Sequence, residues 1–126
     1  MHERLSGIYR IKNDVIGSVY IGRAVDILDR WRNHINSLDN WTHPSPLLQR
    51  DWKIQKGCGF TLEVLEEVEN VNISYMTQRE NFWIRKSRDE DILVYNDYVP
   101  YKLCGKKRKA STLLRLQESF VNWLKS

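Results

Sequence analysis

The sequence predicts an α/β fold in which helices flank a small three-stranded antiparallel sheet. Residues 6–12 and 18–22 form two short alternating segments around a turn-forming stretch, a pattern typical of a β-hairpin. Residues 60–68 alternate in the same way and supply a third strand. Apolar residues recur at helical spacing after the hairpin and again after the third strand, so we expect helices packed around the sheet.

Length and charge divide the chain into two parts. Its 126 residues leave room for one domain, which we assign to residues 1–97. Residues 98–126 are expected to form a basic tail with an extra C-terminal amphipathic helix. This tail holds seven Lys or Arg and one acid, a net charge of +6, so the total of +4 leaves −2 for the domain. Its most basic segment is Lys106, Lys107, Arg108 and Lys109. That segment is either a solvated loop or an arm that contacts phosphates, and charge alone leaves both open.

The first helix should begin at Asp26, because aspartate is a preferred N-cap residue. Its buried face is predicted from helical spacing and consists of Ile27, Trp31, Ile35 and Leu38. Arg30 and His34 are four residues apart, so they share a different face of the same helix.

Two further helices follow in the first part of the chain. Ser45 and Pro46 predict the start of one helix, with Ser45 as the cap and Pro46 in the first turn. The next helix is expected at residues 74–86, followed by a charged loop at residues 86–91. Its inward stripe is predicted to contain Ile73, Met76, Glu80 and either Trp83 or Ile84.

Glu80 stands out because it is a carboxylate on an otherwise apolar stripe. A buried carboxylate is paired, protonated or bound to a metal. The residues alone leave open a structural salt bridge with a neighbouring arginine.

The residues that could carry chemistry follow one order along the chain. They are Gly7-Ile8-Tyr9, Tyr20-Ile21-Gly22, Arg30, His34, Glu80 and Asn96. This order resembles the GIY-YIG nuclease family, and in detail the catalytic domains of its phage homing endonucleases. The resemblance covers residues 6–97. His43 also lies where those enzymes carry a second histidine.

The resemblance implies a metal-dependent endonuclease that hydrolyses DNA phosphodiester bonds, by nicking or double-strand cleavage, of a homing or restriction type. It implies that Tyr9 acts as general base or orients the water, and that Tyr20 assists by hydrogen bonding. Asn96 would anchor local structure or touch the site. Tyrosine has a reference pKa of about 10, so Tyr9 needs nearby cations to act as a base. If they stood alone, the two tyrosines would be interpreted as ordinary strand aromatics.

Phosphodiester cleavage needs an activated water, charge neutralisation on the phosphate and help for the leaving oxygen. One divalent ion, Mg²⁺ or Mn²⁺, held by Glu80 would serve the last two needs, since Mg²⁺ keeps several waters. Arg30 would present its guanidinium to the scissile phosphate, unless it pairs with Asp26 or Asp29. His34 would shuttle protons or position the water.

Arg23 and His43 complete the expected substrate-binding set, together with residues 106–109. Some branches of the family carry a lysine where this chain has Arg23, and arginine cannot act as a base. Duplex DNA is the expected partner, with specificity from the tail, from a homodimer or from a partner protein. A non-catalytic or partner-dependent nucleic-acid-binding accessory protein on the same fold is the alternative.

The sequence also favours a location. No apolar run reaches the length of a membrane span, and the N-terminus shows no signal peptide. The two cysteines match no metal-ligand spacing, so we expect reduced thiols in the cytoplasm of a bacterial or phage-infected cell.

Overall fold

The computed structural model describes residues 4–97, and the basic tail with its expected helix lies outside the described residues. The elements, in chain order, are β1 (Gly7–Asn13), β2 (Val19–Ala24), α1 (Ile27–Asp39), α2 (Pro46–Gln55), β3 (Phe60–Glu67), α3 (Ile73–Asp89) and the 3₁₀ turn η1 (Tyr95–Asp97). The fold is therefore the predicted three-stranded antiparallel sheet with helices around it. No helix within residues 4–97 is long and apolar enough to cross a membrane.

The sheet has the strand order β2-β1-β3, and β1 pairs antiparallel with both neighbours. In the β1–β2 pair Tyr9 lies opposite Gly22, and Ile11 lies opposite Tyr20. Because side chains alternate along a strand, Tyr9 and Tyr20 point to the same face of the sheet.

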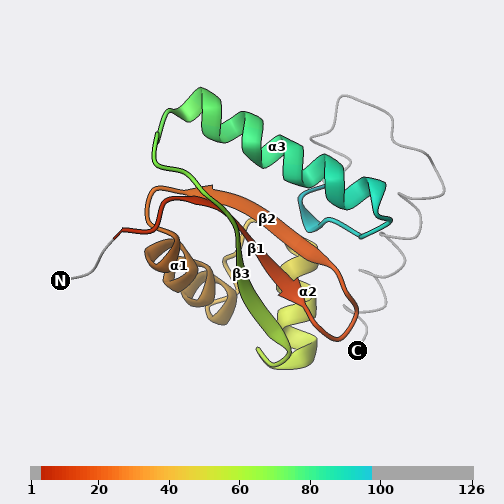
Figure 1. Ribbon diagram of the computed structural model, residues 1–126. Coiled ribbons are helices and arrows are strands. Elements are labelled where there is room, and N and C mark those ends of the chain that lie inside the picture. The colour runs from red at the N-terminus through yellow and green to blue at the C-terminus, as the bar shows by residue number, and fades with distance from the viewer. Residues whose placement is uncertain (1–3, 98–126) are drawn as a thin grey trace.

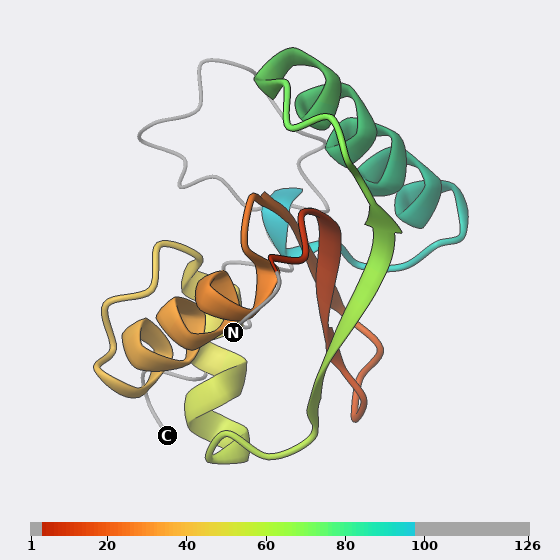
Figure 2. The ribbon, with the colours of Figure 1, turned by 60° about the vertical axis from the view of Figure 1, so that its left-hand side comes forward.

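The molecule has three layers (Figure 1). α1 and α2 cover one face of the sheet and α3 covers the other, as the turned view in Figure 2 also shows. The first face is packed with Tyr9, Ile11, Ala24, Ile27, Leu38, Leu47, Leu48 and Tyr95. The second face is packed with Ile8, Val19, Ile21 and Val94, against which Trp83 and Ile84 of α3 lie. Apolar burial on both faces fixes where the helices sit relative to the strands.

The starts of α1 and α2 are as predicted. The Asp26 side chain accepts a hydrogen bond from the Asp29 backbone N–H, and Ser45 accepts one from Leu48. These caps satisfy backbone donors that have no partner within the helix.

The structure corrects three expectations. α3 continues to Asp89, so the expected charged loop at residues 86–91 is wrong for most of its length. Its lysine and arginine near the C-terminal end favour helix, because cations there complement the helix dipole. Ile73 is 75% exposed and does not belong to the inward stripe. Val64 is 44% exposed although it lies opposite the buried Tyr9, and the alternation of β3 is interrupted just after it, where the register shifts between Tyr9 and Ile8.

The outer edge of β2 is partly closed by the segment that follows α3. Val94 forms an isolated parallel bridge with Val19, and η1 comes directly after it. This contact places residues 94–97, the end of the described chain, beside β2, the strand that contains Tyr20.

Candidate active site

The two tyrosines owe their position to the hairpin register. Tyr9 is 2% exposed, and its ring fits over Gly22 because glycine has no side chain. A Cβ at position 22 would lie 2.4 Å from the Tyr9 hydroxyl oxygen. Gly7 is required for a similar reason, since a Cβ there would lie 2.0 Å from the Glu66 carbonyl oxygen of β3. The glycines therefore allow the close approaches on which the tyrosine positions depend.

α1 brings Arg30 and His34 to the same side as the tyrosines. Arg30 is exposed, whereas His34, one turn later, is 8% exposed. The His34 Nε2 atom lies 2.6 Å from the Tyr9 hydroxyl oxygen. One helix face therefore supplies a solvent-facing cation and a buried imidazole.

His43 forms a buried pair with His34. Its Nε2 atom lies 2.8 Å from His34 Nδ1, and its Nδ1 atom accepts a hydrogen bond of 3.0 Å from the Ser45 backbone N–H. The Tyr20 ring packs edge-on against both imidazoles. His43 does not line the pocket described below, and it meets the site through His34 and Tyr20.

Glu80 reaches the site from α3, the helix on the opposite face of the sheet. Its carboxylate accepts a 3.2 Å hydrogen bond from Arg23 Nη1 on β2. The Glu80 side chain is 18% exposed and that of Arg23 is 41% exposed. Glu80 therefore forms the salt bridge with a neighbouring arginine that the sequence left open. Its partner, Arg23, lies close to the site and is exposed to solvent.

Asn96 in η1 binds the backbone of β2. Its amide oxygen accepts from the Ile21 N–H at 2.9 Å, and its amide nitrogen donates to the Ile21 carbonyl at 2.6 Å. Asn96 thus satisfies two groups at the open edge of β2 and also lines the pocket beside them.

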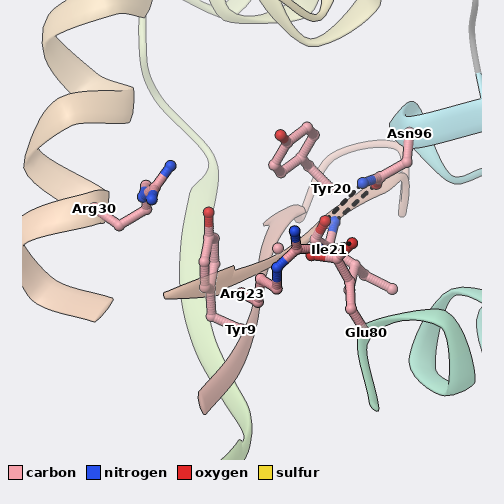
Figure 3. A pocket seen from close by; sticks show the side chains of 8 residues that line it. Tyr9, Tyr20, Ile21, Arg23, Arg30, Glu80 and Asn96 are labelled. Carbon is pink, nitrogen blue, oxygen red and sulfur yellow. Dashed lines mark hydrogen bonds and ion pairs between the residues drawn. The ribbon is translucent and has the colours of Figure 1, made fainter. Parts of the chain in front are cut away.

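These residues surround one open pocket of about 210 Å³. Its lining consists of Tyr9, Tyr20, Ile21, Gly22, Arg23, Arg30, Glu80 and Asn96. Figure 3 shows the Arg30 guanidinium and the Tyr9 hydroxyl facing the same space, with Glu80 and Asn96 across from them. The structure therefore brings together six residues that the sequence analysis selected.

A second, uncharged pocket of about 190 Å³ adjoins the first. It is lined by Tyr20, Pro44, Ser45, Tyr95 and Asn96, so Tyr20 and Asn96 belong to both pockets.

The pocket groups affect one another's protonation. Burial raises the pKa of Tyr9 and of Tyr20, and the nearby Arg30 opposes that rise in both. Burial also raises the pKa of Glu80, whereas Arg23 lowers it. Burial lowers the pKa of His34 and of His43 to about 4, so both imidazoles are neutral near pH 7.

The donors at the pocket suit a hard divalent cation. Within residues 4–97 no three His, Cys, Asp or Glu side chains cluster as a metal cage. Glu80 is one carboxylate at an open polar pocket, which matches an ion that keeps most of its waters. The same set does not match zinc, which prefers three or four nitrogen or sulfur ligands.

Two supporting groups were not identified from the sequence. The Tyr95 hydroxyl donates to Asp51 Oδ2 at 2.6 Å and accepts from Asn13, which holds η1, and with it Asn96, against α2. Glu66 of β3 accepts hydrogen bonds from Arg79 and Trp83, which flank Glu80 on α3. The residues around Glu66 belong to no local pattern that predicts this contact.

Comparison with known proteins agrees with the fold. A protein family described as "GIY-YIG catalytic domain" matches residues 5–92 of this chain. Intron-associated endonuclease 1 of Enterobacteria phage T4 is 40% identical over 81 residues, which make up 64% of this chain and 32% of that relative. The chain thus matches only about a third of that protein's length.

Two solved structures are similar as well, each at 35% identity. One is a mutant of the catalytic domain of intron endonuclease I-TevI, with a TM-score of 0.64 over 71% of this chain and 90% of the other. The second is the catalytic domain of homing endonuclease I-TevI, with a TM-score of 0.63 over 70% of this chain and 94% of the other. The fold is that of an endonuclease catalytic domain. The chain belongs to the GIY-YIG family.

Proposed function

We propose that this chain is a metal-dependent endonuclease that hydrolyses phosphodiester bonds in duplex DNA. The observation that carries the proposal is the single pocket at which Tyr9, Arg30 and Glu80 meet in a GIY-YIG domain. They come from β1, α1 and α3, so no local sequence constraint explains their meeting.

The cationic side chains are suited to bind the phosphate. Arg30 is exposed, carries a permanent charge and offers a planar fork of donors that matches two phosphate oxygens. Arg23 pairs with Glu80 and is 41% exposed, so it would be available to a second phosphate oxygen if Glu80 held a metal ion. The uncharged pocket beyond Tyr20 leaves space for a sugar or base of the adjoining nucleotide.

Glu80 is the residue that would hold Mg²⁺ or Mn²⁺. When bound, such an ion neutralises charge on the phosphate and assists the leaving oxygen. Tyr9 and Tyr20 place two hydroxyls at the pocket, where they orient the attacking water. Asn96 holds the Ile21 backbone and thereby fixes the strand segment that carries Tyr20.

The proposal is tested with supercoiled plasmid and the Glu80→Gln variant, which removes the charge and keeps the shape. With Mg²⁺ the wild-type protein should nick or cut the plasmid, and EDTA should stop it. Glu80→Gln should lower the rate by at least about a hundredfold, the scale for one electrostatic group at the transition state. DNA binding, measured by gel shift, should persist because phosphate contacts dominate affinity.

Glu63→Gln is the matched control. Glu63 is also ion-paired, to Arg10 on the central strand, but it does not line the pocket. This variant should cleave like the wild type. A wild-type protein that binds DNA and never cleaves it would instead support an accessory nucleic-acid-binding role.

A further inference from the structure

The hydrogen-bond chain from Ser45 to Tyr9 has a fixed direction. It starts at a backbone N–H, which can only donate, and this group donates to His43 Nδ1. The His43 Nδ1 atom must therefore carry a lone pair, so the ring hydrogen of His43 is on Nε2.

The same reasoning passes to the next ring. His43 Nε2 lies 2.8 Å from His34 Nδ1, and only one hydrogen fits between two nitrogen atoms at that distance. Because His43 supplies that hydrogen, His34 Nδ1 is an acceptor. The hydrogen of His34 is then on Nε2, which faces the Tyr9 hydroxyl oxygen at 2.6 Å.

We propose that the Ser45 backbone N–H, acting through His43, holds His34 as a hydrogen-bond donor to Tyr9. His34 then cannot accept the proton of Tyr9, because both of its nitrogen atoms are already used. The Tyr9 hydroxyl accepts from His34 and keeps its own hydrogen for the pocket that it lines. His43 is in this sense a positioning residue, since it acts on Tyr9 only through His34.

The direction of the hydrogen bond from His34 to Tyr9 affects the protonation of Tyr9. Its relevance to cleavage rests on the proposed function. A hydrogen bond donated to the Tyr9 oxygen stabilises the phenolate over the phenol, so it opposes the effect of burial on this group. Any proton that leaves Tyr9 leaves toward the pocket and not toward the histidines. Tautomer control of this kind matters in other hydrolases, where the wrong imidazole tautomer removes most of the activity.

The tautomers can be measured without any cleavage assay. Long-range ¹H–¹⁵N correlation spectra of the ¹⁵N-labelled 126-residue chain at pH 7 report which ring nitrogen carries hydrogen. The chain has three histidines, so signals are assigned with His34→Gln and His43→Gln. We expect His34 and His43 to be neutral and protonated on Nε2. A hydrogen on Nδ1 of either ring, or a cationic ring at pH 7, would overturn the inference.

Two substitutions at His43 separate positioning from packing. His43→Gln keeps an N–H that can donate to His34, whereas His43→Leu removes the donor. In His43→Leu, the His34 spectrum should gain the Nδ1-protonated form, and the cleavage rate should fall at least about tenfold, as for other groups that orient a functional imidazole. His43→Gln should keep the Nε2 tautomer of His34 and lose clearly less activity.

The outcomes distinguish this inference from the proposed function. The expected tautomers without plasmid cleavage by the wild type would overturn the nuclease and leave the hydrogen-bond chain in place. Cleavage with an Nδ1-protonated His34 would leave the nuclease in place and overturn the chain. Equal loss of activity in both His43 variants, with the His34 tautomer unchanged, would show that His43 only packs.

Discussion

His34 and His43 make the stability of the domain depend on pH. Burial holds both pKa values at about 4, below the reference value of 6.5 for an unfolded chain, and Arg30 adds to the effect at His34. Below pH 6.5 the unfolded chain gains protons that the folded protein does not bind. The stabilising contribution of the neutral pair is therefore complete above pH 6.5 and is lost as the pH falls toward 4.

We expect urea unfolding to show this loss between pH 7.5 and pH 4.5. Carboxylates titrate in the same range, so the comparison is with the double variant His34→Gln, His43→Gln. The wild type should lose more free energy of unfolding than this variant over the interval. Parallel pH dependences in the two proteins would show that the pair does not contribute.

At the scale of elements, Glu66 adds a polar link between β3 and α3 to the apolar packing of Trp83 and Ile84 against the sheet. It binds Arg79 and the Trp83 ring N–H, and Glu80 lies on the helix between those two residues. Arg79 also lowers the pKa of Glu66, so the carboxylate is ionised near neutral pH. The position of Glu80 in the pocket thus depends on the contacts of Glu66, which lie on the sheet face that α3 covers.

Glu66→Ala should therefore lower the cleavage rate by more than its loss of unfolding free energy alone would cause. Glu63→Ala is the matched control, because it removes a comparable part-exposed ion pair from the same strand without touching α3. Each variant should cost about 1 kcal/mol or less of unfolding free energy for its ion pair. Single-turnover rates should fall severalfold only in Glu66→Ala, and an equal decrease in both would refute the link.

Local sequence signals predicted the helices and strands well. The features that they did not predict depend on contacts between residues far apart in the sequence. The helix starts at Asp26 and Ser45 were found because a cap depends on neighbouring residues. The irregularity in β3 depends on pairing with β1, more than fifty residues earlier, and no short pattern in β3 encodes it. Glu80 was selected because a charged side chain interrupted an apolar stripe. The Tyr95–Asp51 and Glu66–Trp83 contacts join distant segments, so no local pattern predicted that these residues meet.

At the scale of the whole molecule, charge is divided between the catalytic region and the tail. Residues 98–126 carry +6 and the rest carries −2, so a duplex should be attracted mostly by the tail. The assignment of residues 1–97 and 98–126 as separate parts stays a prediction, as does DNA contact by residues 106–109, because the tail lies outside the described residues.

Replacing Lys106, Lys107, Arg108 and Lys109 with alanine tests this division. Each duplex phosphate contact that is lost should make the slope of log affinity against log salt shallower by roughly 0.9. Any sequence preference should persist, because phosphate contacts carry no base information. Binding titrations between low and moderate salt measure the slope, and an unchanged slope would identify the segment as a solvated loop.

The contact between Tyr9 and Gly22 joins the two halves of the motif into one steric unit. A methyl group at position 22 would occupy the space of the phenol, with 2.5 Å from its carbon to the Tyr9 Cζ atom, so removing the hydroxyl alone would not relieve the clash. Position 22 can therefore gain a side chain only if position 9 loses its aromatic ring or the strands separate. Among proteins of this fold, we expect any residue other than glycine at position 22 to mark a chain that has lost this tyrosine placement, even where its arginine and glutamate are intact.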